Sequence, residues 1–205
     1  MAWWRAIYGL GWFPMEEGDD GIQLFRSRER ALLPLGADFH VPRSLQRHLR
    51  RQPEQGGFRL GLNHAFPTVL DGCRDRSRTW ISHGLAAVYR RLHAGGLAHS
   101  VEVWHGDTLA AGMLCIGIGA CWIGESMFHR RPQAGNVLLV SLARALAQSG
   151  FQLFDVQISN PHLERFGCFT ISDALFTPAL ALACSQPAIL RLQGDAVSCE
   201  PWMAG

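Results

Sequence analysis

The segment LAAGMLCIGIGACWIGESMF spans residues 109–128 and contains one charged residue, Glu125. It consists of two apolar runs, 109–119 and 120–128, each of which is typical of a central strand in a sheet. The second run changes abruptly to HRR at 129–131. Its end is therefore interpreted either as a tight turn into a solvated helix or as part of a functional site.

The sequence on either side of this segment alternates between helix and strand patterns. Upstream, residues 79–96 have a helical pattern that ends in a glycine pair, and AHSVEVW at 98–104 is typical of a strand. Downstream, residues 136–150 have helical periodicity with a possible cap at Asn136, and FQLFDVQI at 151–158 again has a strand pattern. This alternation predicts an α/β or α+β layered domain.

The two ends of the chain are less regular. Residues 1–40 are aromatic and interrupted by Gly and Pro, which predicts a small, irregular and truncated N-terminal piece. Residues 41–185 are predicted to form the main domain. The remaining residues, 186–205, are expected to be a loosely ordered tail.

The composition is that of a soluble globular protein. Of the 205 residues, 48% are hydrophobic and 18% are charged, so the chain is long enough to bury a core. The six cysteines include no CxxC pair, so neither a metal site nor a disulfide framework is expected. The N-terminus lacks the features of a signal peptide and no apolar run predicts a membrane span, which favours a cytoplasmic protein without a membrane partner.

All 19 basic residues are arginine, although the formal net charge is only +2. The segment PRSLQRHLRR at 42–51 is predicted to be helical, with Arg43, Arg47, Arg50 and Arg51 on one face. This face is interpreted either as a solvated surface or as a stripe that binds RNA.

Three acidic or amide side chains stand out in the apolar strands. Asp155 and Gln157 are two residues apart and share one face of their strand, so a hydrogen bond from the Gln amide to the Asp is expected. They form either a structural polar pair or part of a site. Glu125 follows a glycine that permits close approach of another group. It either forms an ion pair with Arg130 or Arg131 or belongs to a site.

Several motifs occur in a distinctive order, beginning with YGLGWFP at 8–14. They continue with TWIS at 79–82, YRRLH at 89–93, GLAHSVEVW at 96–104, GESMF at 124–128, DVQ at 155–157 and PHLERFG at 161–167. In order and spacing this combination closely resembles the leucyl/phenylalanyl-tRNA protein transferase family, over residues 8 to about 176.

The resemblance implies a GNAT-like acyltransferase domain, with a mixed, mostly antiparallel sheet flanked by helices. It also implies transfer of Leu, Phe or Met from aminoacyl-tRNA (Leu-tRNA, Phe-tRNA) to the N-terminal Arg or Lys of acceptor proteins, which marks them for degradation. The donor is already an activated ester, so the enzyme has to position an amine and stabilise charge. No cofactor and no metal are expected.

The same resemblance implies roles for particular residues. Gln157, oriented by Asp155, would accept a hydrogen bond from the attacking amine. Glu125 would bind the cationic acceptor or the amino group of the donor. The aminoacyl pocket would be apolar, with walls from Met113, Trp122, Met127 and Phe154.

Contacts to the tRNA are also implied. Trp80 would stack on the terminal adenosine, an interaction worth roughly 1 to 3 kcal/mol per base. Phe25 would contribute a further contact to the donor. Arg130 and Arg131 precede the start of a helix, and a helix N-terminus with nearby arginines is a natural binding site for the phosphates.

The chain departs from the family pattern near these implied substrate sites. LFRSRER at 24–30 stands where the family has WWSPDPR, so Phe25 replaces a tryptophan. His129 replaces a serine, Asn136 a lysine and Arg165 a serine. These changes suggest a diverged paralogue with an altered substrate.

Three alternatives remain at this stage. The chain could transfer the aminoacyl group to a small molecule or to another peptide, or it could be a non-catalytic RNA-binding relative. A catalyst built on His129 and His162 is the least favoured, because nothing in the sequence places His162 near Glu125.

Overall fold

The computed structural model describes residues 1–16, 21–51, 57–75 and 79–203. Within these residues, seven strands form one sheet in the order β4-β5-β6-β7-β8-β3-β9. Their bounds are β3 Glu29–Leu33, β4 Arg59–Leu62, β5 Ala98–His105, β6 Thr108–Ile118, β7 Cys121–His129, β8 Leu153–Gln157 and β9 Phe169–Ser172. Strands β7 and β8 pair in parallel, whereas the other neighbours are antiparallel. The prediction of a mixed, mostly antiparallel sheet is confirmed.

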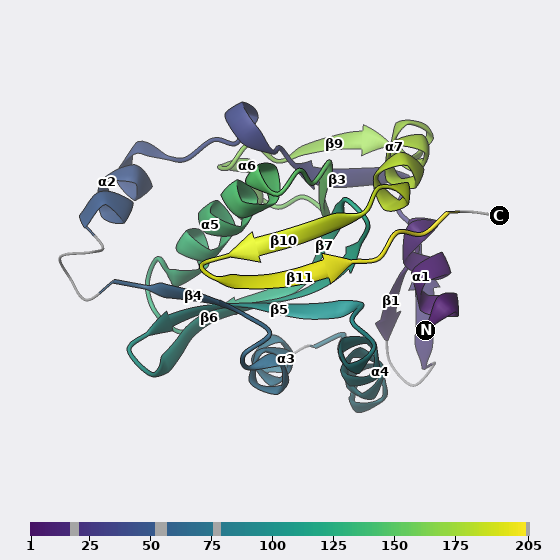
Figure 1. Ribbon diagram of the computed structural model, residues 1–205, viewed down its shortest axis with the longest axis horizontal. Coiled ribbons are helices and arrows are strands. Elements are labelled where there is room, and N and C mark those ends of the chain that lie inside the picture. Colours follow the sequence, from purple (N-terminus) through teal and green to yellow (C-terminus); the bar gives the residue numbers. More distant parts are fainter. Residues whose placement is uncertain (17–20, 52–56, 76–78, 204–205) are drawn as a thin grey trace.

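Helices cover both faces of this sheet (Figure 1). Helix α5 lies on one face, and α3 and α4 lie on the other. Side chains of β6 alternate accordingly: Met113 and Cys115 belong to the core beneath α5, whereas Leu114 and Ile116 belong to the core beneath α3 and α4. The helices are α1 Ala2–Gly9, α2 Arg43–Arg51, α3 Phe66–Arg74, α4 His83–Ala94, α5 Ala134–Gln148, α6 Pro161–Glu164 and α7 Asp173–Ser185, with a short 3-10 turn at Gly36–Asp38.

The start of α5 differs from the predicted cap. Gln133, in a left-handed conformation with φ of 66°, is the N-cap, and Asn136 lies inside the first turn. The Asn136 amide donates to Gln133 Oε1 at 2.6 Å. Asn136 therefore stabilises the cap residue rather than capping the helix itself.

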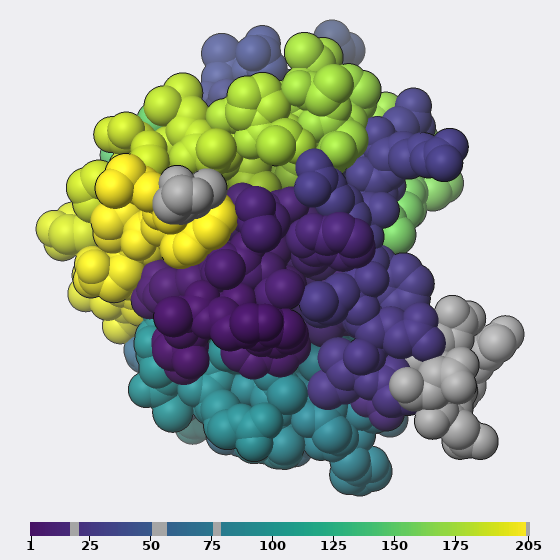
Figure 2. Space-filling view, turned by 90° about the vertical axis from the view of Figure 1, so that its right-hand side faces the viewer, coloured from purple at the N-terminus to yellow at the C-terminus, as the bar shows by residue number. Residues whose placement is uncertain are grey.

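The N-terminal piece is not separate from the main domain, so the predicted boundary at residue 40 is wrong. Strand β3 lies inside the central sheet, between β8 and β9. Ahead of it, α1 is followed by a hairpin of β1, Phe13–Glu16, and β2, Ile22–Phe25. Figure 2 shows the purple N-terminal residues wedged between α7 above and α4 below.

The prediction of a loose C-terminal tail is also wrong. Strands β10, Ala188–Leu192, and β11, Asp195–Cys199, form a hairpin that packs on α5 and β4. At its tip, the side chains of Gln193 and Asp195 accept hydrogen bonds from the backbone N–H groups of Leu60 and Leu62. The hairpin thus satisfies donors along the otherwise open edge of the sheet.

Helix α2 confirms the predicted helix near residues 42–51. Arg43, Arg47 and Arg50 are exposed, while the side chain of Arg51 is outside the described part of the structure. Whether this face meets RNA stays a prediction. In the described residues, none of the helices has the length and apolar character needed to cross a membrane.

Candidate active site

The two central strands β7 and β8 separate at one end, and this separation creates the candidate site. Their parallel pairing includes Ile123 opposite Asp155 and does not continue beyond it. Just past this point each strand contains a bulge, because Glu125 has no counterpart on β6 and Val156 has none on β3. Bulges redirect side chains and interrupt pairing, so both strands turn away from one another here.

A cavity of about 330 Å³ opens where the strands separate. Glu125 and Gln157 both contribute to its wall, so two of the three side chains expected to be catalytic share one cavity. The rest of the lining comes from Phe13, Met15, Trp80, Met113, Gly124, Ser126, Met127, Leu139, Val156, Ile158, Asn160, His162 and Leu163. This lining is mainly apolar, with a few polar groups, as is usual in sites for small organic groups.

Glu125 is a buried carboxylate, and one of its two oxygens accepts a hydrogen bond. The Tyr89 hydroxyl donates to Oε2 at 3.1 Å, and the Tyr8 hydroxyl lies 3.4 Å from that of Tyr89. Oε1 is buried and has no hydrogen-bond partner among the described residues. The predicted alternative of an ion pair with Arg130 or Arg131 is not found, since no salt bridge of Glu125 occurs in the described part of the chain.

Burial raises the pKa of Glu125 to about 7, because the ionised carboxylate loses its hydration. The nearby polar side chains of Gln157, Tyr8 and Tyr89 oppose this shift, although among these three only Tyr89 forms a hydrogen bond to the carboxylate in the described structure. The positive charge of Arg30 also favours the ionised form. Near pH 7 the carboxyl group therefore exchanges readily between its two protonation states. A cationic substrate group next to it would shift the balance towards the anion.

Asp155 is completely buried and is paired with Arg30, a residue that sequence analysis did not assign to the site. Arg30 Nε donates to both carboxylate oxygens at 2.9 Å, and its NH2 group donates to Oδ2 at 2.6 Å. Asp155 Oδ1 also accepts the backbone N–H of Gln157 at 2.8 Å. The expected bond from the Gln157 side-chain amide to Asp155 is therefore replaced by a bond from its backbone.

Arg30 connects three parts of the molecule. Besides its bonds to Asp155, it donates to the carbonyl of Gly11 at 3.1 Å. Its guanidinium lies over the rings of Phe13 and Phe176, at 4.9 and 5.0 Å from their centroids. The buried cation is thus enclosed by a carboxylate, a carbonyl and two aromatic faces, each of which offsets its loss of hydration.

Gln157 has an unusual backbone conformation at the end of β8. Its φ is 63°, in the left-handed region that non-glycine residues rarely adopt. The bond from its backbone N–H to Asp155 holds this conformation. Its side-chain Nε2 is buried and unpaired within the described residues, so the amide is available to a ligand in the cavity. Strained residues of this kind are often found at functional sites.

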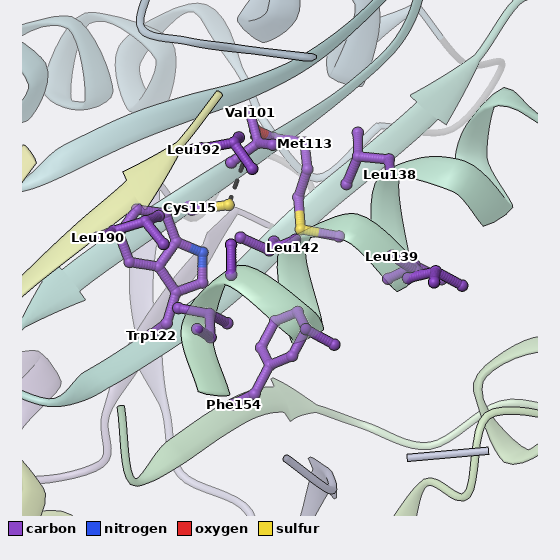
Figure 3. Packing of buried hydrophobic residues seen from close by; sticks show 14 of the residues in the cluster. Val101, Met113, Cys115, Trp122, Leu138, Leu139, Leu142, Phe154, Leu190 and Leu192 are labelled. Carbon is purple, nitrogen blue, oxygen red and sulfur yellow. Dashed lines mark hydrogen bonds between the residues drawn. The ribbon is translucent and has the colours of Figure 1, made fainter. Parts of the chain in front are cut away.

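The predicted aminoacyl pocket is only partly reproduced. Met113 and Met127 line the cavity, but Trp122 and Phe154 do not. Trp122 is fully buried, with its ring stacked on His99. In Figure 3 the ring of Trp122 lies beside Leu190 of the C-terminal hairpin and apart from Met113, which lines the cavity. Trp122 and Phe154 lie opposite one another in the paired part of β7 and β8, before the strands separate, and both pack in the core beneath α5. Val156, Leu139 and Leu163 complete the apolar wall in their place.

Trp80 lines the cavity, and its stacking on the terminal adenosine stays a prediction. Its carbonyl accepts the backbone N–H of Glu16 on β1, and the Glu16 carboxylate accepts the hydroxyl of Ser82. Phe25 is not on the cavity wall. Its ring lies 6.4 Å from that of Phe13, so it supports a wall residue from behind.

The basic residues after β7 lie outside the cavity wall. Arg130 and Arg131 are exposed, and Arg130 covers the ring of Phe128 at 5.1 Å. His162, in contrast, contributes to the same cavity as Glu125, a proximity that the sequence did not indicate. Burial, with Arg165 and His129 nearby, lowers the pKa of His162 and favours its neutral form.

Sequence reasoning missed three residues of this site, namely Tyr8, Arg30 and Tyr89. Tyr8 and Tyr89 are the first residues of the quoted YGLGWFP and YRRLH motifs, so a signal for them was present. Arg30 ends the LFRSRER segment and stands at the final arginine of the family's WWSPDPR, so a signal for it was present as well. Within the described residues, no group of three or more His, Cys, Asp or Glu side chains is arranged to hold a metal ion.

Known proteins share both sequence and motifs with this chain. The family model for leucyl/phenylalanyl-tRNA protein transferase matches residues 32–181. A leucyl/phenylalanyl-tRNA–protein transferase of Thermosynechococcus vestitus is 46% identical over 88% of this chain and 89% of its own length. Relatives with the same name from Synechocystis and Nostoc are 43% and 42% identical, over 87% and 89% of this chain and 88% and 94% of their own lengths.

Among solved structures, the C-terminal domain of a putative lysylphosphatidylglycerol synthetase from Agrobacterium fabrum is similar with a TM-score of 0.41 and 13% identity. That match covers 89% of this chain and 55% of the other. The sequence matches are far stronger, and they extend over the strands and helices that build the cavity. The chain belongs to the leucyl/phenylalanyl-tRNA protein transferase family.

Proposed function

We propose that this protein transfers a leucyl, phenylalanyl or methionyl group from aminoacyl-tRNA to the N-terminal Arg or Lys of acceptor proteins in the cytoplasm. Such a modification would mark the acceptor for degradation. The observation that carries the proposal is that Glu125 and Gln157 face one largely apolar cavity. Family membership supports the choice of reaction.

The apolar side of the cavity suits the side chain of the donor amino acid. Met113, Met127, Leu139 and Val156 offer apolar surface, and methionine side chains adapt to ligands of different shape. A charged donor side chain would lose its hydration here without a partner, which disfavours it. Trp80 is on the same wall and would stack on the adenosine that carries the aminoacyl ester.

The polar side of the cavity suits an amine. In the reaction the neutral α-amino nitrogen forms a bond to the ester carbon, and the bond from that carbon to the tRNA oxygen breaks. One proton leaves the nitrogen, and the departing oxygen takes up a proton to become a hydroxyl group. Gln157 would position the attacking amine, with Asp155 holding its backbone rather than its side chain. Glu125 would attract a cationic group of the acceptor, since its Oε1 is unpaired in the described structure.

The test is a transfer assay with radiolabelled Leu-tRNA or Phe-tRNA and a short peptide that begins with Arg. We expect label in the peptide, and none in a matched peptide whose N-terminus is acetylated. Glu125→Gln should raise KM for the Arg peptide, whereas Gln157→Ala should lower kcat. No transfer to any peptide with N-terminal Arg or Lys would reject the proposed acceptor. Mass spectrometry of products formed in cell extract would then identify another acceptor, if one exists.

A further inference from the structure

Two buried tyrosines form a hydrogen-bonded chain that ends on Glu125. Tyr89 on α4 donates its hydroxyl proton to Glu125 Oε2 at 3.1 Å. The hydroxyl of Tyr8, on α1, lies 3.4 Å from that of Tyr89. A tyrosine has one hydroxyl proton to donate, and that of Tyr89 points to the carboxylate, so Tyr8 must be the donor in the second bond. The chain therefore has one direction, from Tyr8 through Tyr89 to Glu125.

The two carboxylate oxygens of Glu125 have different surroundings. Oε2 is held by Tyr89, whereas Oε1 has no partner among the described residues although Glu125 is on the cavity wall. We propose that Tyr89 and Tyr8 are positioning residues that fix the Glu125 carboxylate by one oxygen and leave the other free for the ammonium or guanidinium group of the acceptor. The inference rests on the proposed function, because it assigns Glu125 to the acceptor.

Other groups around Glu125 also influence its charge. Arg30 on β3 favours the ionised carboxylate, as does the amide of Gln157 on β8. The thiol of Cys115 on β6 interacts electrostatically with Glu125, and that of Cys73 on α3 with Tyr89. Asp155 is paired with Arg30. His162 is the other titratable side chain on the cavity wall. Burial raises the pKa of both tyrosines well above 10, so they remain donors across the working pH range.

The variant Tyr89→Phe removes the donor oxygen and keeps the ring. Without that bond the ionised carboxylate is less stable, and the midpoint of Glu125 ionisation should rise by about one pH unit. From a starting pKa of about 7, the ionised fraction at pH 7 would fall from about a half to about a tenth. We therefore expect kcat/KM for the Arg peptide to fall about fivefold at pH 7 and to be nearly unchanged at pH 9.

Two comparisons isolate this effect. The ratio of variant to wild-type rates cancels the titration of the peptide amine, which is the same in both reactions. Tyr8→Phe should give a smaller change in the same direction, because it leaves the bond from Tyr89 to Glu125 intact. Thr177→Val, which removes a hydroxyl bonded to Arg26 on the surface, should leave the ratio at one throughout.

A direct measurement separates this inference from the proposed function. The carbon-13 resonance of the Glu125 carboxyl group, assigned by its loss in Glu125→Gln, reports ionisation without any substrate. A higher midpoint in Tyr89→Phe would support the positioning role even if no transfer is detected. An unchanged midpoint, or a rate ratio that does not vary with pH, would overturn it. If Tyr89→Phe does not fold, the ionisation midpoint of Glu125 and the pH dependence of the rate ratio are measured in Tyr8→Phe, and they test the inference in the same way.

Discussion

The buried pair of Arg30 and Asp155 gives the sharpest test of how the site is held together. Arg30→Met removes the cation, while the methionine side chain still fills the space between the rings of Phe13 and Phe176. Asp155 is then buried and charged, and the backbone N–H of Gln157 is its one remaining hydrogen-bond donor among the described residues. Breaking a buried pair in this way costs about 3 to 5 kcal/mol, because the remaining charge is uncompensated.

The structure supplies a matched control for this variant. Arg26 makes the same two-pronged contact with Asp173, Nε to one oxygen at 3.0 Å and NH2 to the other at 2.8 Å. The side chains of that pair are 29% and 39% exposed, against 2% and 0% for Arg30 and Asp155. An exposed pair contributes about 0.2 to 1 kcal/mol. Arg26→Met should therefore be nearly neutral.

Thermal unfolding is the assay. An entropy of unfolding of about 2.1 cal/mol/K per residue gives roughly 0.4 kcal/mol/K for 205 residues. The melting temperature should therefore fall by about 7 to 12 °C in Arg30→Met and by at most about 2 °C in Arg26→Met. Adding Asp155→Asn to Arg30→Met should restore at least about 2 kcal/mol, because the buried charge is gone. Equal, small shifts in the two single variants would refute the reasoning.

Two further predictions concern the cavity wall and the packing behind it. Trp80→Ala should raise KM for aminoacyl-tRNA by about 5- to 150-fold through loss of base stacking, with Trp80→Phe intermediate; an unchanged KM would exclude the stacking role. Gly112→Ala should destabilise the fold by about 1 to 3 kcal/mol, because the new Cβ would lie 2.8 Å from the side chains of Phe128 and Val69. Gly124→Ala, where the nearest atom is 3.5 Å away, is its control in thermal melts.

Much of the sheet could be predicted because local patterns specify it. Strand β6 and the first half of β7 are apolar runs, and α5 has clear helical periodicity. The sequence of the C-terminal hairpin also contains a pattern that favours two strands joined by a turn. Leu190 and Leu192 alternate with exposed residues, and the turn residues Gln193 and Gly194 both have positive φ. That is the signature of a two-residue hairpin turn.

The details of the site could not be predicted, because they depend on contacts between distant residues. The bulge at Glu125 exists only relative to its partner strand β6, which strand alternation within one segment cannot reveal. Arg30 belongs to a segment rich in charge, and charged side chains are seldom buried unless they are paired. Its burial depends on Asp155, 125 positions away in the chain. The prediction that Asp155 would hold the Gln157 side chain failed for a related reason: Arg30 and the backbone of Gln157 already occupy its oxygens.

The N-terminal segment, which the sequence presented as an appendage, completes the site from one side. The hydroxyl of Tyr8 is hydrogen-bonded to that of Tyr89, which donates to Glu125, and Arg30 is paired with Asp155. Phe13 forms part of the cavity wall, and Glu16 fixes the loop that carries Trp80. These contacts join the first thirty residues to α4, to β8 and to the loop that precedes α4. The side chains proposed to face the donor and those proposed to face the acceptor both depend on the N-terminal segment. A change that loosens this segment should therefore impair binding of the donor and of the acceptor together.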